Sequence, residues 1–420
     1  MAPVATLRRV DRYPQWALAT LAVISRLIPW ALLRLLSSLP AFDSSAQLLS
    51  GRESSTSLRW DAIHFASIAK DGYRYEQHIA FQPGWPLLLR ALSSVIPGQT
   101  TGVDEVGRIA QMGELLACGS YVGATIMLYR LTCRISTPPF ALTASLLYLL
   151  PPAPGVLSSS MSEPLFALLT FTGFYLAVRR RFWLSAQVLA GATSVRATGV
   201  LAVGPVAWIM MFGEEPILRT LRRPVRLARR CISCIPPVAI IIAPFVTSQT
   251  YFYYALCQGG EREEWCSNAL PLAYSHVQEK YWNVGMLNYW SPAQIPNILL
   301  ALPVLLVSLL VPYVSTATRQ TNLHILLPFY IHSLALTLLL LFSAHTQIAL
   351  RVCVTDPVIW WSLAGLAFRW KGSSRSFGAA STDTEGKEDD MTRMSKVWVW
   401  WTIIYGAISI VLWAGHYPPA

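Results

Sequence analysis

The sequence predicts an all-α membrane protein with many spans, and two features of its composition carry this prediction. Of the 420 residues, 54% are hydrophobic and only 13% are charged, whereas about a quarter of the residues in soluble domains are charged. Apolar runs of about 17 to 25 residues recur along almost the whole chain, which is the length of a helix that crosses a bilayer. We therefore expect one integral-membrane domain over residues 1–420, a helical bundle of about 9 to 12 spans.

The first apolar run is expected to be an uncleaved span, because it is longer than a signal peptide needs and no small-residue cleavage site is obvious. The shorter of the expected spans are also compatible with re-entrant segments. In chain order the expected spans are 14–37, 107–129, 138–155, 160–178, 182–196, 198–213, 232–254, 295–314, 323–343, 348–368 and 397–415.

Clusters of Arg and Lys set the expected orientation of these spans. The stretch LRTLRRPVRLARR (Leu218–Arg230) holds six Arg and no acid, as cytosolic segments do under the positive-inside rule. We place the N-terminus and a flexible loop at 371–396 on the same side. All the basic segments fall on the cytosolic side only if the stretch 182–213 crosses the membrane an even number of times. We therefore divide this stretch into two spans near Arg196. The net charge of +11 lies in such clusters and does not indicate a nucleic-acid partner.

The opposite side carries two long loops, 38–106 and 255–294, and most of the candidate functional side chains. Ionisable groups near the membrane are costly and are therefore often functional. The candidates on this side are Trp60, Asp61, His64, Lys70, Glu163, Arg196, Trp265, Trp282, Asn283, His345 and Arg351.

Several of these candidates have structural alternatives. Lys70 can belong to a solvated helix face, and Trp282 to an interfacial aromatic belt. Glu163 precedes a proline and can be a first-turn residue that meets a helix dipole. Arg196 and Arg351 can snorkel, but arginine is also the best residue for holding a phosphate by paired donors.

Asp61 follows an aromatic residue in a pattern that does not anchor a span, so we predict a general base with a sugar-stacking neighbour. The chain has no Gly-rich phosphate loop, no HExxH and no DxD-type carboxylate pair. A metal-dependent enzyme that uses a soluble nucleotide sugar is therefore disfavoured. The pair Cys231 and Cys234 has the CxxC spacing without further ligands and is read as structural.

Five segments resemble the eukaryotic GPI mannosyltransferase II family, whose members add the second mannose to the glycosylphosphatidylinositol (GPI) precursor. They occur in family order and span most of the chain. One departure is Gln82, which stands after Phe81 where family members usually carry a second aromatic residue. The segments are WDAIHFASIAKDGYRYEQHIAFQPGWPLL (Trp60–Leu88), MSEPLFALLTF (Met161–Phe171), SVRATG (Ser194–Gly199), WCSNALPLAYSHVQEKYWNVGMLNYWSPAQIPNILLALP (Trp265–Pro303) and HTQIALR (His345–Arg351).

The resemblance implies a GT-C-like helical fold in the endoplasmic-reticulum membrane, with a lumenal active site. It implies dolichol-phosphate-mannose as donor, a mannosylated GPI lipid as acceptor and an inverting α-1,6 transfer. The matching position makes Asp61 the base and Trp60 its positioning neighbour. From charge and topology, Arg196 and Arg351 would stabilise the leaving phosphate, with His345 or Lys70 in support.

The same resemblance implies contact with membrane lipids, no cofactor and no essential metal, and it leaves room for a small membrane partner subunit. On this topology Cys257 and Cys266 face an oxidising lumen and can form a disulfide. Three alternatives stay open: another dolichol-phosphate-mannose transferase, a lipid transporter and a non-catalytic subunit. The YWNVG block at Tyr281–Gly285 argues against the other transferases, by resemblance.

Overall fold

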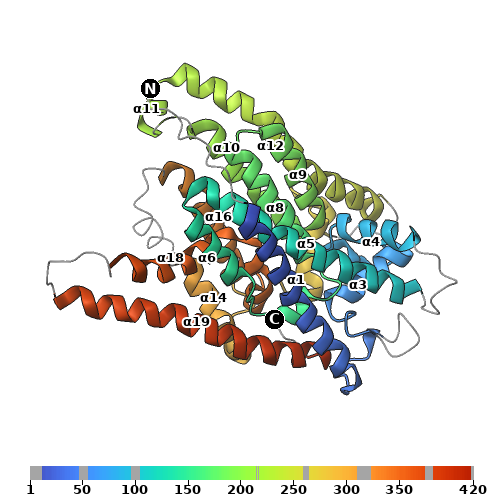
Figure 1. Ribbon diagram of the computed structural model, residues 1–420. Coiled ribbons are helices and arrows are strands. Elements are labelled where there is room, and N and C mark those ends of the chain that lie inside the picture. Colours follow the sequence, from blue (N-terminus) through green and yellow to red (C-terminus); the bar gives the residue numbers. More distant parts are fainter. Residues whose placement is uncertain are drawn as a thin grey trace.

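The protein is helical throughout the part of the chain that the structure describes. The computed structural model describes residues 12–46, 55–95, 105–213, 215, 217–258, 264–309, 323–373 and 382–417. Its regular elements in these ranges are α-helices and 3-10 helices, with no strand among them (Figure 1). The prediction of an all-α fold is confirmed.

The described helices are those of a multi-pass membrane protein. Six of them are long and apolar enough to cross a bilayer, and a bent pair, Thr346–Thr355 with Pro357–Ala367, adds a further candidate. Three shorter apolar helices follow one another at Glu163–Val178, Phe182–Val195 and Ala197–Phe212. The six long candidates are Gln15–Ser38, Glu105–Ile135, Pro224–Cys257, Pro292–Leu309, Ile325–Phe342 and Lys396–Ala414.

The first half of the chain packs its helices one after another. The helix pairs α5 with α8 and α8 with α9 make the most extensive contacts of the fold. The elements are α1 (Arg12–Leu35), η1 (Leu36–Ser38), α3 (Asp61–Asp71), η2 (Glu76–Ala80), α4 (Gly84–Val95), α5 (Glu105–Ile135), α6 (Pro138–Tyr148), α7 (Pro154–Leu157), α8 (Glu163–Val178), α9 (Phe182–Val195), η3 (Ala197–Ala202) and α10 (Val203–Phe212).

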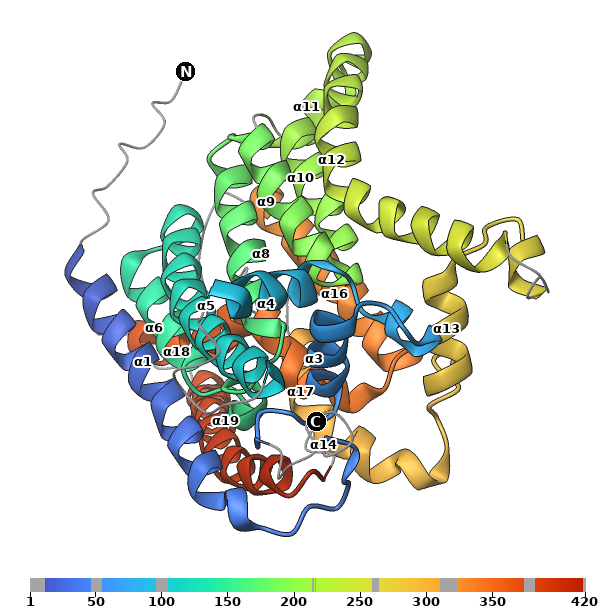
Figure 2. The same cartoon turned by 90° about the vertical axis from the view of Figure 1, so that its right-hand side faces the viewer.

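The second half completes the bundle around the same core. Figure 2 shows α12 extending beyond the rest of the bundle on the side of α11, while α13 lies near the opposite end of α12. The elements are α11 (Ile217–Leu221), α12 (Pro224–Cys257), η4 (Glu264–Ser267), α13 (Ala273–Trp282), η5 (Pro292–Gln294), α14 (Ile295–Leu309), α16 (Leu323–Phe342), η6 (Thr346–Ile348), α17 (Ala349–Val352), η7 (Cys353–Thr355), α18 (Pro357–Ser373) and α19 (Thr382–Ala414).

Two of the expected spans are broken, and proline explains both breaks. The span expected at 138–155 stops at Tyr148, because the prolines of the PPAP stretch disfavour helix in the residues before them. The span expected at 348–368 bends by 82° at Asp356, which precedes Pro357. This second break leaves the short helix α17 at the level of the loops instead of inside a straight span.

Two other segments contain more helix than expected. The Arg-rich stretch read as a loop forms α11 and the start of α12, which has proline at its first position, where proline fits a helix. Helix also covers most of 371–396, since α18 ends at Ser373 and α19 begins at Thr382.

The two long loops meet at one end of the bundle, as the expected topology requires. The carboxylate of Glu76 in η2 lies 2.9 Å from Lys280 Nζ, and the Tyr281 hydroxyl donates to it at 2.7 Å. A small apolar core that includes Ile79, Phe252 and Trp265 joins η2, α12 and η4 beneath this contact. The two loops therefore form one folded layer.

The disulfide that the topology allows is present in this layer. Cys257 ends α12 and is bonded to Cys266 in η4, with a sequence separation of 9. The bond fixes the start of the second long loop to the end of a membrane helix.

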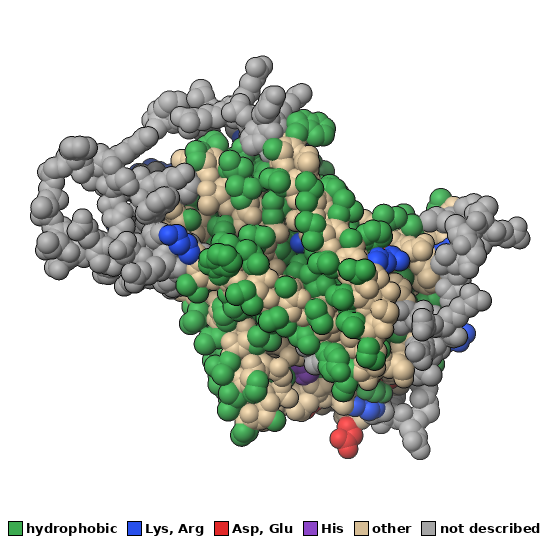
Figure 3. All heavy atoms as spheres, turned by 60° about the horizontal axis from the view of Figure 1, so that its bottom comes forward, with side chains coloured by type: hydrophobic (Ala, Val, Ile, Leu, Met, Phe, Trp, Pro, Cys, Tyr) green, Lys and Arg blue, Asp and Glu red, His purple; other side chains and the backbone are tan. Residues whose placement is uncertain are grey.

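The surface of the bundle is that of a protein in lipid. Figure 3 shows a face on which hydrophobic side chains dominate and charged ones are scattered. Large apolar side chains are exposed along the long helices, for example Trp16 and Leu27 on α1, Ile232 on α12 and Leu338 on α16. Such a surface is expected where the surrounding medium is hydrocarbon.

Candidate active site

A cavity of about 380 Å³ lies between the loop layer and the membrane helices. We call the part around the Asp61–Arg351 pair and Arg196 its polar end, and the part lined by Phe245 of α12 and Leu336, Leu339 and Leu340 of α16 its apolar end. The polar lining residues are Asp61, Gln82, Ser162, Arg196, Thr198, Tyr274, Gln278, Ser343, His345 and Arg351. The apolar and aromatic ones include Phe65, Phe81, Val200, Leu201, Phe245, Trp282, Leu336, Leu339 and Leu340.

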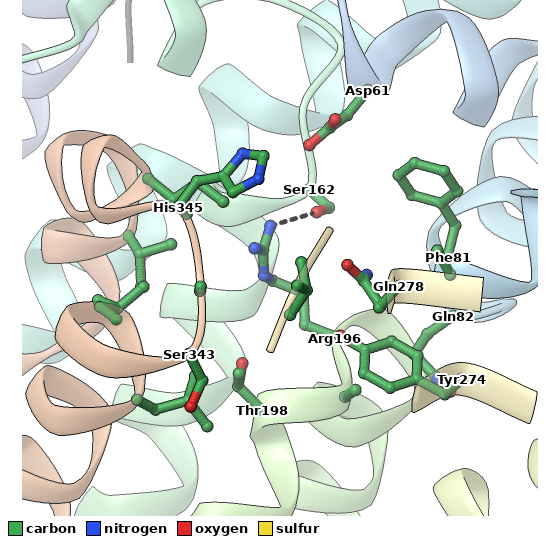
Figure 4. Close-up of a pocket in the computed structure, with 18 of the residues that line it drawn as sticks. Asp61, Phe81, Gln82, Ser162, Arg196, Thr198, Tyr274, Gln278, Ser343 and His345 are labelled. Carbon is green, nitrogen blue, oxygen red and sulfur yellow. Dashed lines mark hydrogen bonds between the residues drawn. The ribbon is translucent and has the colours of Figure 1, made fainter. Parts of the chain in front are cut away.

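Four charged side chains form a continuous chain at the polar end. Arg351 Nη2 lies 2.6 Å from Asp61 Oδ2, and Arg351 Nε lies 3.4 Å from Glu163 Oε1. Arg196 Nη1 lies 2.8 Å from the same Glu163 oxygen and also donates to Ser162 Oγ at 3.3 Å. In Figure 4 the guanidinium of Arg196 points from below toward the end where Asp61 lies.

Asp61 is the first residue of α3, where the helix dipole favours a carboxylate. Burial raises the pKa of Asp61, but the charge and hydrogen bond of Arg351, with smaller contributions from Arg196 and His64, lower that pKa below its ordinary value. Its side chain keeps 26% of its surface exposed. Asp61 is thus an ionised, reachable carboxylate beside a cation.

The backbone just before Asp61 is strained. Trp60 has φ 50° and ψ −124°, and the amide of Ala62 donates to the carbonyl of Arg59 at 3.0 Å. These are the angles of the first central residue of a type II′ turn, a position that glycine normally occupies. Strain of this kind persists only where the surroundings enforce it, and it is common at functional sites.

The chain segment after α19 helps to hold Trp60 in this conformation. The Trp60 amide donates to His416 Nε2 at 3.4 Å, and His416 Nδ1 lies 2.8 Å from the carbonyl of Asp43. The Trp60 indole contacts the His416 ring edge to face, with 5.5 Å between ring centres, and donates to the Tyr417 carbonyl at 3.3 Å. Trp60 is therefore positioned beside Asp61, but it does not line the cavity.

The structure places five of the candidates, Asp61, Arg196, Trp282, His345 and Arg351, in the lining of this one cavity. His345 Nε2 lies 2.8 Å from the Trp282 carbonyl, which holds the start of η6 against the end of α13. These five candidates come from four separate segments of the chain.

His64 and Glu163 lie just behind this wall. The His64 ring stacks on Phe81 with 4.9 Å between ring centres, and burial lowers the pKa of His64, so that it is neutral at pH 7. Glu163 has no exposed side-chain surface and contacts the cavity only through the two arginines. Neither residue lines the cavity.

Lys70, Trp265 and Asn283 lie outside the cavity lining. Lys70 is in the last turn of α3, at the opposite end from Asp61. Trp265 is buried and stacks on His276 with 5.5 Å between ring centres. Asn283 has φ 52° and ends α13 in the left-handed conformation that asparagine tolerates. The structure gives Trp265 and Asn283 a local role in the loop layer.

Six polar lining residues were missed: Gln82, Ser162, Thr198, Tyr274, Gln278 and Ser343. Gln82 is 2% exposed and its amide nitrogen has no partner among the described residues, while its amide oxygen accepts from Ser248 at 3.2 Å. The departure from two aromatic residues before Pro83 was a signal for Gln82. Tyr274 and Gln278 are four residues apart in α13 and share a face, a spacing that pointed to a common surface.

No group of three or more His, Cys, Asp or Glu that could hold a metal is found among the described residues. The absence of an essential metal stays a prediction. With two arginines and a carboxylate at one end and an apolar wall at the other, the cavity suits an anionic group attached to a lipid.

Comparisons with known proteins identify the family of this chain. The family model described as "Mannosyltransferase (PIG-V)" matches residues 12–420. A Cryptococcus neoformans protein named GPI mannosyltransferase 2 is 38% identical, over 95% of this chain and 97% of that relative. A Cricetulus griseus protein named GPI alpha-1,6-mannosyltransferase 2 is 31% identical, over 73% of this chain and 72% of that relative.

Among solved structures, the chain is similar to an Archaeoglobus fulgidus oligosaccharyltransferase, with a TM-score of 0.49 and 11% identity, over 96% of this chain and 55% of that one. The sequence relatives confirm the resemblance first drawn from the five segments. Since the family model covers nearly the whole chain, this protein belongs to the PIG-V family of mannosyltransferases.

Proposed function

We propose that this GPI mannosyltransferase adds the second mannose to the GPI precursor through an α-1,6 bond, using dolichol-phosphate-mannose on the lumenal side of the endoplasmic reticulum. The relatives' names support the GPI acceptor and the bond type. The observation that carries the proposal is the cavity itself, which joins an Asp–Arg pair to an apolar wall from α12 and α16.

The side chains at the polar end can catalyse a single nucleophilic displacement at C1 of the donor mannose. The acceptor hydroxyl gives its proton to Asp61, and its oxygen forms the new bond to C1 of the donor mannose. The bond between C1 and the phosphate oxygen breaks, and its electron pair goes to that oxygen. Arg351 and Arg196 hold the phosphate as its charge grows. Attack from the face opposite the phosphate inverts the anomeric centre.

Donor binding also explains how a paired carboxylate can act as a base. In the free enzyme Arg351 holds Asp61 ionised. A bound phosphodiester offers Arg351 an alternative anion, and two oxygens of a phosphate suit its planar fork. Once Arg351 turns to the phosphate, the burial that remains favours protonation of Asp61.

Charge asymmetry supports the proposed lumenal location. The Arg-rich segment in α11 and α12 lies at the opposite end of α12 from the loop layer. Under the positive-inside rule that segment is cytosolic, so the cavity and the disulfide face the lumen. A small membrane partner subunit is compatible with this arrangement, and activity of the purified single chain would show that none is needed.

The proposal is tested in cells that lack the second GPI mannosylation step. Expression of this chain should restore GPI-anchored proteins at the cell surface and remove the one-mannose intermediate. Persistence of that intermediate despite normal expression in the membrane would refute the assignment. It would favour another dolichol-phosphate-mannose transferase, a transporter or a non-catalytic subunit.

Asp61→Asn tests the base in the same cells and should abolish rescue. The matched control is Asp71→Asn, because Asp71 lies at the other end of α3 with the same 26% side-chain exposure and forms only a long, 3.8 Å pair with Arg74. Asp71→Asn should rescue fully. Full rescue by Asp61→Asn would remove the base role and leave the family assignment intact.

A further inference from the structure

Glu163 occupies an unusual place, at the centre of the charged chain but behind the cavity wall. Its side chain has no exposed surface, and it does not line the cavity. One of its oxygens lies 2.8 Å from Arg196 and 3.4 Å from Arg351, and neither oxygen accepts a well-aligned hydrogen bond from the described residues. Both arginines do line the cavity.

The segment that carries Glu163 fixes it firmly. Glu163 is the first residue of α8 and is followed by Pro164, whose ring sets the first helical turn. Helix α8 makes extensive contacts with both α5 and α9, and Arg196 directly follows α9. The carboxylate therefore sits at a rigid point between the segments that carry the two arginines.

The charges of these four side chains balance when no substrate is bound. Asp61 and Glu163 are negative, and Arg196 and Arg351 are positive. A buried charge is retained only when it is paired, so Glu163 is the permanent partner of both arginines. Asp61 and the donor phosphate can then alternate as the second partner of Arg351.

We propose that Glu163 is a positioning residue, which aims Arg196 and Arg351 at the leaving phosphate without touching either substrate. This inference rests on the proposed mannosyl transfer and replaces the prediction that Glu163 binds substrate. The two guanidinium groups converge on one anion because a shared carboxylate holds them from behind. The structure thus separates the residues that contact the phosphate from the residue that orients them.

A steady-state assay with a lipid-linked mannose donor and a mannosylated GPI acceptor tests this role. The enzyme is the full chain in detergent, and rates are normalised to folded protein. Glu163→Gln removes the shared charge and leaves one net positive charge at the polar end. The anionic donor should therefore bind at least as well, with an unchanged or lower KM. Because the arginines are no longer held in the right orientation toward the phosphate, kcat should fall by about 10- to 100-fold.

Two further variants distinguish the orientation of the arginines from the effects of charge and of folding. Glu163→Asp keeps the charge and should recover part of the lost kcat. Glu114→Gln is the matched control, since Glu114 is also buried and is paired with Arg34 at 2.7 Å, in contact with α1 and away from the cavity. It should lower the folded yield but leave kcat and both KM values unchanged.

Two outcomes would overturn the inference. A raised acceptor KM in Glu163→Gln, with kcat preserved, would mean that Glu163 contacts the acceptor. Kinetics identical to those of Glu114→Gln would mean that Glu163 only supports folding. An inactive wild-type chain in the same assay would instead refute the proposed function, so the two failures are distinguishable.

Discussion

Arg351 Nη2 lies 2.6 Å from Asp61 Oδ2 although 290 residues separate them in the chain. Asp61 begins a helix of the first long loop, and Arg351 lies in α17, after the bundle has been crossed many times. The pair brings the proposed base and the proposed phosphate-binding cation into direct contact. In the proposed reaction, the donor phosphate competes with Asp61 for Arg351. Donor binding would therefore free Asp61 from its ion pair.

The first prediction follows from this pair and concerns pH. Arg351→Gln should move the acid limb of the kcat/KM profile to higher pH, because burial raises the pKa of Asp61 and Arg351 opposes it. Arg196 and His64 still lower that pKa in the variant, so the limb moves only part of the way. The loss of phosphate binding should also reduce kcat/KM about 100-fold.

The ion pair between Asp61 and Arg351 also makes the stability of the fold depend on pH. A lowered pKa of Asp61 stabilises the folded protein above the ordinary aspartate value of about 3.9, and this contribution is lost as pH falls through the lower folded value. Arg351→Lys keeps the charge and should hold the limb near the wild-type position. A limb that does not move in Arg351→Gln would argue that another group controls it.

The second prediction concerns the lipid of the donor. Leu336 lines the apolar end of the cavity, and Leu336→Trp should narrow that end. The KM for a long-chain isoprenoid donor should rise about 5- to 150-fold, because the lost apolar contact is worth about 1 to 3 kcal/mol. The KM for a short-chain analogue should change little.

Leu338 provides the control for this substitution. It lies on the same helix, is 41% exposed and does not line the cavity. Leu338→Trp should leave the KM for both donors unchanged. Equal effects of the two substitutions would indicate a general disturbance of α16 and would contradict a lipid site at Leu336.

Much of the site could be predicted because its residues break the apolar pattern. Asp61, Arg196 and Arg351 are costly near a membrane, so their presence pointed to chemistry. The sequence could not reveal that one buried carboxylate joins the two arginines, because Glu163 looked equally suited to a helix start. Trp265 and Asn283 were assigned to the site because they lie in a family-like block, although packing and helix ending explain both.

The helices were predicted from composition and the division near Arg196 from the basic segments, but the breaks after Tyr148 and at Asp356 were not predicted. Hydropathy does not show where α17 and α18 separate, although the bend at Asp356 places Arg351 beside Asp61. Proline at 357 was the local signal, but a proline inside an apolar run can also produce a mild kink. Tertiary contacts decide between the two, and a single sequence does not contain them.

The third prediction concerns the disulfide between Cys257 and Cys266. Closing a loop with a sequence separation of 9 removes entropy from the unfolded chain, which stabilises the fold by about 3 kcal/mol on a chain-entropy model. Replacing both cysteines by serine should lower the Tm of the detergent-solubilised protein by several degrees. Reductant should lower the wild-type Tm similarly and leave the double variant unchanged.

Cys231 provides the control for the disulfide. It is a free and exposed cysteine on α12. Cys231→Ser should leave the Tm and its response to reductant as in the wild type. An unchanged Tm in the Cys257/Cys266 double variant would mean that the loop layer is held by its other contacts, such as the one between Glu76 and Lys280.

The fourth prediction concerns the strained turn before the base. His416 itself has φ 59°, and asparagine tolerates this conformation better than most residues do. His416→Asn therefore keeps the backbone and removes the imidazole that joins the Trp60 amide to the Asp43 carbonyl. Asp61 should then be held less firmly, and kcat should fall about tenfold with little change in the donor KM.

Trp60→Gly removes the strain together with the indole contacts to His416 and Tyr417. Glycine relieves the positive φ of residue 60, so the turn no longer depends on His416 for its conformation. His416→Asn should therefore cost much less activity in a Trp60→Gly background than in the wild type. If the two substitutions instead act additively, His416 does not hold the turn and the strain at Trp60 has another cause.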